Sequence, residues 1–216
     1  MKTIYDDYVE LVGIFPTPIY FAMCNDDIQD SIEYIESVEL HNSSNSTKQN
    51  YGSRSEDTYI LHHDECASLR NFIKLHLDHY ARNVLAYKFN NISITQSWVS
   101  IKNPGEKHTY HKHPNSIISG CFYWNEEAVQ EISFKKSFRN TNLDIERNTA
   151  ISNDFAWDFH KFSPRKNTLI LFPSEVEHGV ESNSFDMPRK SLAFNSMIFE
   201  TLGLKENLTE LILTSY

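Results

Sequence analysis

The sequence predicts an α+β protein, mainly β, in which helices pack on one face of an antiparallel β core. Aromatic residues make up 13% of the chain, which favours β structure over a helical bundle. The helix patterns all lie before residue 90, and short strand patterns separated by turns follow it. This order is typical of a barrel or sandwich that carries its helices on one side.

The first part of the chain predicts one edge strand and two helices. Residues 11–23 are apolar and β-prone, and their two prolines suit an edge strand. Residues 27–38 place Ile and Val at the spacing of a short amphipathic helix. The polar, Ser- and Asn-rich residues 39–57 are predicted to form a long loop. Residues 64–88 carry the clearest helix pattern, and Asp64 is its candidate N-cap.

The second part predicts a series of strands that are broken by turns. These strands cover 92–103, 117–124, 131–134, 167–172, 176–181 and 189–199. The polar and irregular residues 137–166 are predicted to form an insert or lid. We expect a single domain over 1–216, with an N-terminal strand and helical support (1–90), a β core (91–200) and a C-terminal segment (201–216).

Charge and cysteine content exclude several classes of function. The net charge of −9 argues against a nucleic-acid polymer as partner and against a polybasic membrane anchor. No apolar run approaches the length of a bilayer span, and the N-terminus has no signal-peptide core. Three widely spaced cysteines do not form a disulfide framework, so we expect a reducing, cytoplasmic environment.

A histidine cluster is the first candidate for a metal site. His111 and His113 lie two residues apart, and on a strand such residues point to the same face. Two imidazoles directed at one point are the start of a metal site. The alternative is a solvated strand on which two histidines occur together by chance.

A distant segment supplies the residues that would complete such a site. His178 follows an apolar strand and a turn, where it can provide a third ligand. Arg189 and Ser191 open the last long strand and would face the same side. A guanidinium with a neighbouring hydroxyl is suited to bind a carboxylate. The alternative for Arg189 is a surface position facing the acidic bulk of the protein.

The order of these motifs resembles the 2-oxoglutarate/Fe(II)-dependent dioxygenases, and within them the prolyl-hydroxylase-like branch. That branch has a glycine turn, HxD, a distal His and RxS about ten residues later, and here Gly105 lies six residues before His111. A closer similarity is to bacterial and phage proteins described as 2OG-Fe(II) oxygenases. Their hallmarks correspond to FPTP (15–18), HKHPNSIISGCFY (111–123), LFPSEVEH (171–178) and AFN (193–195).

The resemblance, which spans residues 12–200, implies a fold, a cofactor and a reaction. The fold would be a double-stranded β-helix, a core of the jelly-roll or cupin type. Fe(II) would be held by His111, His113 and His178, and 2-oxoglutarate by Arg189 and Ser191, with Tyr123 and Asn195 also in the cosubstrate pocket. O2 and 2-oxoglutarate would be cosubstrates, and a substrate would be hydroxylated with release of succinate and CO2. The substrate is left open among proteins, nucleotides and small molecules. Whether the protein forms a homodimer is also left open. A phage-encoded protein would act in the host cytoplasm.

The chain departs from the superfamily pattern at one position. A carboxylate is expected two residues after the first histidine, and His113 stands there. Either His113 is itself a ligand, or the position is filled by water or by a carboxylate such as Glu175 or Glu177. Two other functions therefore stay open: a three-histidine zinc hydrolase or lyase, and a non-catalytic β-helix that binds or scaffolds.

Overall fold

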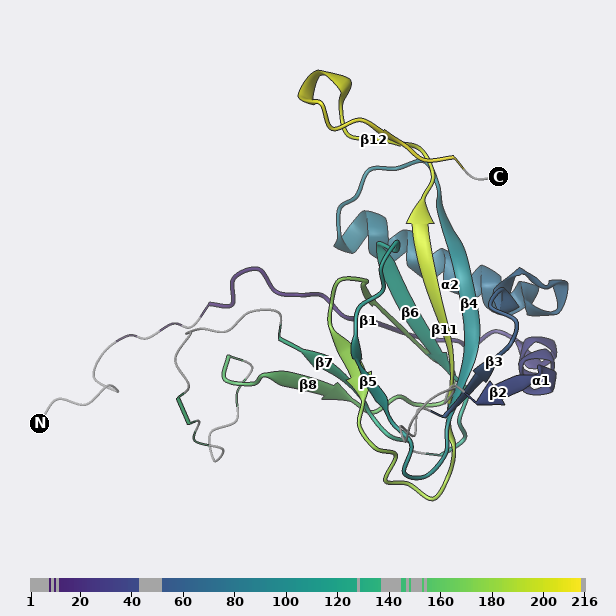
Figure 1. Cartoon of the computed structure of the whole chain (residues 1–216). Coiled ribbons are helices and arrows are strands. Elements are labelled where there is room, and N and C mark those ends of the chain that lie inside the picture. Colours follow the sequence, from purple (N-terminus) through teal and green to yellow (C-terminus); the bar gives the residue numbers. More distant parts are fainter. Residues whose placement is uncertain are drawn as a thin grey trace, which may run out of the picture.

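Figure 1 shows a computed structural model of the chain, in which two antiparallel β-sheets face each other. The structure describes residues 12–42, 52–127, 129–136 and 155–214, and singly residues 8, 10, 145, 146, 148 and 153.

The major sheet has the strand order β1-β9-β6-β11-β4-β3-β2, and the minor sheet has the order β5-β10-β7-β8. The major strands are β1 (Tyr20–Met23), β2 (Leu40–Asn42), β3 (Ser53–Ser55), β4 (Ile92–Lys102), β6 (Ile118–Tyr123), β9 (Thr168–Pro173) and β11 (Arg189–Ile198). The minor strands are β5 (His108–His111), β7 (Ile132–Lys135), β8 (Phe159–Phe162) and β10 (His178–Val180). From β4 to β7, and again from β9 to β11, successive strands alternate between the two sheets. This alternation interleaves the sheets as in a jelly roll.

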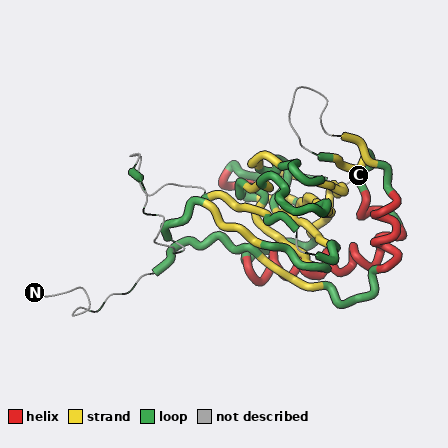
Figure 2. Tube along the Cα trace, turned by 90° about the horizontal axis from the view of Figure 1, so that it is seen from below, coloured by secondary structure: helices red, strands yellow, loops and turns green. Residues whose placement is uncertain are grey.

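The helices that precede β4 lie on one side of the β core, as Figure 2 shows. They are α1 (Gln29–Ser37), α2 (Ala67–His79) and the π-helical turn η4 (Tyr80–Val84), with two short 3₁₀ turns, η2 (Ile60–His62) and η3 (Asp64–Cys66), before α2. The predicted α+β architecture, mainly β with helices on one face, is confirmed.

The ends of α2 differ from the prediction. Asp64 does not cap the helix, because it begins the 3₁₀ turn η3, and the N-cap position belongs to Cys66, without a side-chain hydrogen bond. At the other end the helical segment stops at Val84, four residues before the predicted limit. Ala86 adopts a left-handed conformation with φ 56°, which is incompatible with continued α-helix.

The strands at the edges also differ from the pattern in the sequence. Within the predicted strand 11–23, only Tyr20–Met23 pairs with β9, and β1 is an edge strand as expected. Prolines 16 and 18 lack the N–H groups that pairing would need. The predicted loop 39–57 contains the paired strands β2 and β3, and the predicted insert 137–166 contains β8, so both predictions are wrong at these strands. Residues 201–214 include a small hairpin of β12 (Thr201–Leu202) and β13 (Leu211–Ile212).

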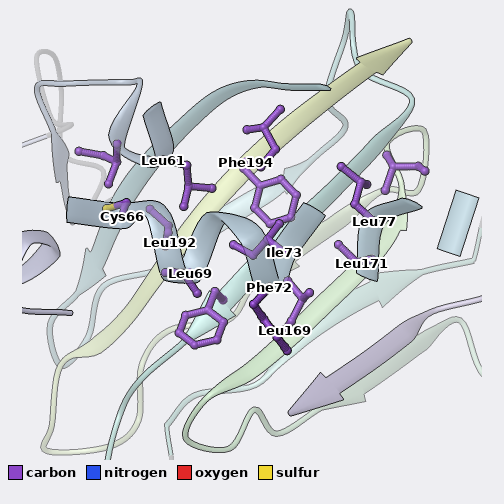
Figure 3. Packing of buried hydrophobic residues seen from close by; sticks show 14 of the residues in the cluster. Leu61, Cys66, Leu69, Phe72, Ile73, Leu77, Leu169, Leu171, Leu192 and Phe194 are labelled. Atoms are coloured by element: carbon purple, nitrogen blue, oxygen red, sulfur yellow. The ribbon is translucent and has the colours of Figure 1, made fainter. Parts of the chain in front are cut away.

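Helix α2 covers the outer face of the major sheet, as Figure 3 shows. On the helix side the contacts come from Leu69, Phe72, Ile73 and Leu77. On the sheet side they come from Leu169, Leu171, Leu192 and Phe194. Because side chains alternate along a strand, the neighbours Ile170, Ser191 and Ala193 point to the opposite face, toward the minor sheet. The apolar outer face thus leaves the inner face free for polar groups.

None of the helices among the described residues is long and apolar enough to cross a membrane.

The contact between α2 and the major sheet is expected to dominate stability. Leu69 is completely buried in it, whereas Leu75 on the same helix is 69% exposed. We predict that Leu69→Ala lowers the free energy of unfolding by about 2–5 kcal/mol, because it removes buried apolar surface and leaves a cavity. Leu75→Ala, the matched control, should change it by less than about 0.5 kcal/mol. Urea titration followed by circular dichroism measures both, and equal values would contradict this account.

Candidate metal centre

Two of the candidate ligands lie side by side on neighbouring strands of the minor sheet. His111, the last residue of β5, is paired in register with His178, the first residue of β10. Antiparallel pairing places such residues on the same face of the sheet. Their ring centroids lie 4.5 Å apart.

His113 reaches the same point by a different route from the predicted one. Strand β5 ends at His111, so the two residues do not share a strand face. The backbone N–H of His113 donates to the carbonyl of Ser174 (3.0 Å), which turns the chain back toward the site. One ligand nitrogen from each of His111, His113 and His178 lies within 4.8 Å of the other two.

Hydrogen bonds fix the orientation of all three imidazoles. The Nδ1 atoms of His111 and His178 lie 2.9 Å from the carbonyl oxygens of Thr109 and Val176. Nδ1 of His113 lies 2.6 Å from Oδ1 of Asn195. Carbonyl oxygens only accept hydrogen bonds, so each Nδ1 carries the proton and each Nε2 keeps its lone pair. Metal-binding histidines need this arrangement.

The donor set fits a cation. Nε2 of His113 lies 3.2 Å from Nε2 of His178, and with both protons on Nδ1 neither nitrogen can donate to the other. Two nitrogens bound to one metal ion at about 2.1 Å, close to a right angle, are about 3 Å apart. The metal-binding group among the described residues contains no carboxylate, and Oε1 of Glu177 lies 3.2 Å from Nζ of Lys135.

Burial keeps His113, His178 and the neighbouring His108 neutral. It lowers the pKa of His178 to about 3, helped by the neighbouring His111 and His113 and opposed by the hydrogen bond to Val176. Burial and His111 lower the pKa of His113 to about 4. His108 stacks on His111 with ring centroids 4.4 Å apart, and burial lowers its pKa as well, to about 2. At neutral pH none of these three rings competes for a metal ion by holding a second proton.

A chain of buried hydroxyls stands behind His113. Oδ1 of Asn195 accepts a second hydrogen bond from Ser119 (3.0 Å). The hydroxyl of Ser174 lies 2.7 Å from the Oγ atoms of both Ser119 and Ser116. Ser119 and Ser174 are almost fully buried. Because the serines fix the amide of Asn195, they fix the orientation of the His113 ring.

The second predicted feature, the anion receptor, lies on the inner face of the major sheet. Arg189 is 3% exposed, and its three bonded nitrogens reach the carbonyl of Gln130 (3.0 Å), Oγ of Ser191 (3.3 Å) and Oη of Tyr123 (2.7 Å). Burial raises the pKa of Tyr123, although Arg189 opposes this, so its phenol stays protonated. Among the described residues no carboxylate forms an ion pair with Arg189.

One small cavity joins the receptor to the histidines. Arg189 and Ser191 line it together with His108, His111, His113 and His178, and Trp98, Cys121 and Ile132 form part of its walls. The structure thus brings together all three predicted metal ligands and two of the four predicted cosubstrate residues. Tyr123 contacts the receptor from behind, and Asn195 contacts His113.

Trp98, for which the sequence offers a pocket wall or core packing, stacks on His113 with ring centroids 5.9 Å apart. The sequence did not reveal Lys102, which is buried on the strand next to Arg189. Alternation along β4 places Trp98, Ser100 and Lys102 on one face, and this alternation could have identified them once the neighbouring strand was known. Ser119 and Ser174 lie in the motifs HKHPNSIISGCFY and LFPSEVEH, but those motifs do not show that the two serines support His113.

Fold and site together define a jelly-roll protein with a three-histidine group beside a buried anion receptor. Residues 96–195 match a family model described as "Putative 2OG-Fe(II) oxygenase". None of the curated proteins matches the chain.

Solved structures of 2-oxoglutarate oxygenases share the fold. A prolyl hydroxylase from Trichoplax adhaerens is 13% identical with a TM-score of 0.54, and 83% of each chain is covered. A Pseudomonas putida prolyl-4-hydroxylase is 12% identical with a TM-score of 0.50, covering 84% of this chain and 94% of that one. HygX from Streptomyces hygroscopicus, with nickel, 2-oxoglutarate and hygromycin B bound, is 10% identical with a TM-score of 0.53, covering 83% and 82%.

The resemblance to the 2-oxoglutarate/Fe(II)-dependent dioxygenase superfamily is confirmed by the family match and by the fold. The core is the double-stranded β-helix that the resemblance implied. Three histidines grouped in this way could hold a metal ion.

Asn195 is expected to act on metal binding through His113. We predict that Asn195→Ala weakens Fe(II) binding about 10–100-fold, because the ring of His113 loses the partner that fixes its proton on Nδ1. Ser119→Ala should weaken it less, since Asn195 then keeps its bond to His113. Calorimetric titration under argon measures both affinities.

The matched control for Asn195→Ala is Asn91→Ala at an exposed position. Its affinity for Fe(II) should equal that of the unmodified protein. Unchanged affinity in Asn195→Ala, in a variant that keeps its melting temperature, would contradict the role of Asn195.

Proposed function

We propose that the protein is an Fe(II)- and 2-oxoglutarate-dependent dioxygenase that hydroxylates a further substrate. His111, His113 and His178 would hold the metal, and Arg189 with Ser191 would bind the distal carboxylate of 2-oxoglutarate. One observation carries this proposal most directly. A buried guanidinium without an acidic partner among the described residues lines the same cavity as three imidazoles whose Nδ1 atoms are each held by an oxygen acceptor.

The chemistry that Fe(II) and O2 supply in such a site is the oxidative decarboxylation of 2-oxoglutarate to succinate and CO2, coupled to hydroxylation of a substrate C–H bond. The protein's own residues do the binding and positioning. The three imidazoles offer nitrogen ligands on one side of the cavity and leave its other side open. Arg189 is held by Gln130 and Tyr123, so it meets a carboxylate in a fixed orientation.

The surroundings of the site favour anion binding and limit access of water. Burial strengthens the attraction between Arg189 and an incoming carboxylate, because the local dielectric constant is low. Ile132 and Val180 contribute apolar walls to the cavity. Ser191 lines the cavity and supplies a hydroxyl that can bond to the second carboxylate oxygen.

The two other functions have less support. A zinc hydrolase or lyase would use the same three histidines, but it gives no role to a buried receptor such as Arg189 and Ser191. A non-catalytic β-helix would not need three imidazoles oriented by separate hydrogen bonds toward one point. Both functions are separated from the proposal by succinate formation.

Binding of 2-oxoglutarate tests the proposal. We predict that Fe(II) and 2-oxoglutarate, mixed with the protein under argon, give a weak visible charge-transfer band. Arg189→Met should raise the 2-oxoglutarate concentration needed for half of the band about 10–100-fold, because the charged hydrogen bonds are lost. Aerobic assays should show succinate formed from 2-oxoglutarate.

The neighbouring Lys190→Met is the matched control for Arg189→Met. Its side chain points to the other face, where Nζ lies 2.6 Å from Glu36, so the band should form as in the unmodified protein. A protein with full iron occupancy and no band would refute the cosubstrate assignment. Hydrolysis supported by zinc, without succinate, would establish the zinc alternative instead.

The role of His113 has its own test. We predict that His113→Ala lowers the affinity for Fe(II) more than about 100-fold, since one of three ligands is removed. His79→Ala, which changes an exposed histidine on α2, should leave the affinity unchanged. Iron binding that survives in His113→Ala would mean that this position is filled by water or by a carboxylate.

A further inference from the structure

A second and larger cavity adjoins the histidines on the side away from Arg189. Its volume is about 770 Å³, which is the size of a small-molecule binding site. It shares Trp98, Ser100 and the three histidines 108, 111 and 113 with the inner cavity. A molecule bound there would lie against the metal centre without occupying the place of Arg189 and Ser191.

The charge of this outer cavity is opposite to that of the protein. Arg54, Lys102 and Lys112 line it, and none of the described residues that line it carries a carboxylate. The whole chain has 29 acidic residues against 20 basic ones. The positive charge concentrates small anions in the cavity. The acidic remainder of the protein surface repels large polyanions.

Lys102 is the most informative of these cations. It is 3% exposed, it pairs in register with Arg189, and Nζ donates to Oγ of Ser100 (2.8 Å). No described carboxylate forms an ion pair with it. Oε2 of the nearby Glu106 accepts instead from the backbone N–H of Asn103 (2.7 Å).

Burial of this ammonium group is costly. Burial, with Arg189 next to it, lowers the pKa of Lys102 to about 8, although Glu106 opposes the shift. An ammonium group has three N–H donors. Among the described residues, Ser100 accepts one hydrogen bond from the ammonium group of Lys102. A bound anion would supply the missing partners and remove part of this cost.

We propose that the main substrate is a small organic anion whose carboxylate or phosphate group binds Lys102 and Arg54 in the outer cavity. Anchoring the anionic group in this way directs the remainder of the substrate toward the three histidines, where its C–H bond would be oxidised. The inference therefore rests on the proposed function. Trp98 and Tyr59 provide aromatic walls for its carbon skeleton.

The cations of the outer cavity are separate from the receptor proposed for 2-oxoglutarate. Arg189 and Ser191 line the inner cavity, whereas Lys102, Arg54 and Lys112 line the outer one. Two anions bound at the same time, each at its own cation, would partly neutralise the buried pair Lys102 and Arg189.

Ligand-observed NMR on the Mn(II)-loaded protein with saturating 2-oxoglutarate tests the proposal. The probes are benzoate, phenyl phosphate and the neutral benzamide, which share one ring. We expect benzoate or phenyl phosphate to bind with its ring protons broadened by Mn(II), and benzamide to bind at least tenfold more weakly. Comparison of the two anions identifies the carboxylate or the phosphate class.

Variants locate the binding site. Lys102→Met and Arg54→Gln should each weaken binding of the anion at least tenfold, and Lys102→Met should not lower the melting temperature, because it removes a buried charge. Lys74→Met, which removes a cation from the exposed side of α2, should have no effect.

Three results would overturn the proposal: equal binding of benzamide and the anions, displacement of the anions by 2-oxoglutarate, or unchanged binding in both cavity variants. Absence of binding by either anion would overturn it too. Failure of the proposed function is recognised separately, because then 2-oxoglutarate itself does not bind while the anions still respond to Lys102→Met and Arg54→Gln.

Discussion

The pairing of β5 with β10 is the constraint on which the site depends. It sets His111 opposite His178, and the chain after β5 then has only two residues in which to bring His113 to the same point. Each ring is held at Nδ1 by a carbonyl oxygen, so the lone pairs of the three Nε2 atoms converge. The Nε2 atoms of His113 and His178 lie 3.2 Å apart. Such an arrangement is electrostatically unfavourable without a cation. A shift of β10 by one residue would turn His178 to the other face and remove the site.

The major sheet can carry this polar interior because its two faces differ: one is apolar and the other lines the site. Leu192 and Phe194 alternate along β11 with Ser191, Ala193 and Asn195, so one strand supplies both the apolar core and the site. Helix α2 buries the apolar side, and this burial must offset the cost of placing Arg189 and Lys102 side by side in the interior. Two neighbouring buried cations without a carboxylate partner among the described residues are hard to explain as stabilising elements. They are readily explained as receptors for anions.

The sequence predicted those features that depend on local pattern. Alternation predicted β4 and β11, and residue type with motif order predicted His111, His113, His178 and Arg189. It failed where tertiary contacts decide. The spacing of His111 and His113 was attributed to one strand, whereas β5 ends at His111 and the Ser174 carbonyl positions His113. Lys102 escaped notice because a lysine at a strand end is normally exposed, and its burial follows only from the approach of the minor sheet.

The motif residues that the resemblance singled out acquire a common physical meaning in the structure. Ser116 and Ser119 belong to the segment after His113, Ser174 to LFPS, and Asn195 to AFN, yet all four form one hydrogen-bonded chain that ends on Nδ1 of His113. A carboxylate at position 113 could bind a metal without such support, since either of its oxygens can serve. An imidazole can bind only through the nitrogen that is not protonated, so its proton must be fixed by a partner. The serine chain therefore supports the histidine that stands at position 113 in place of the expected carboxylate.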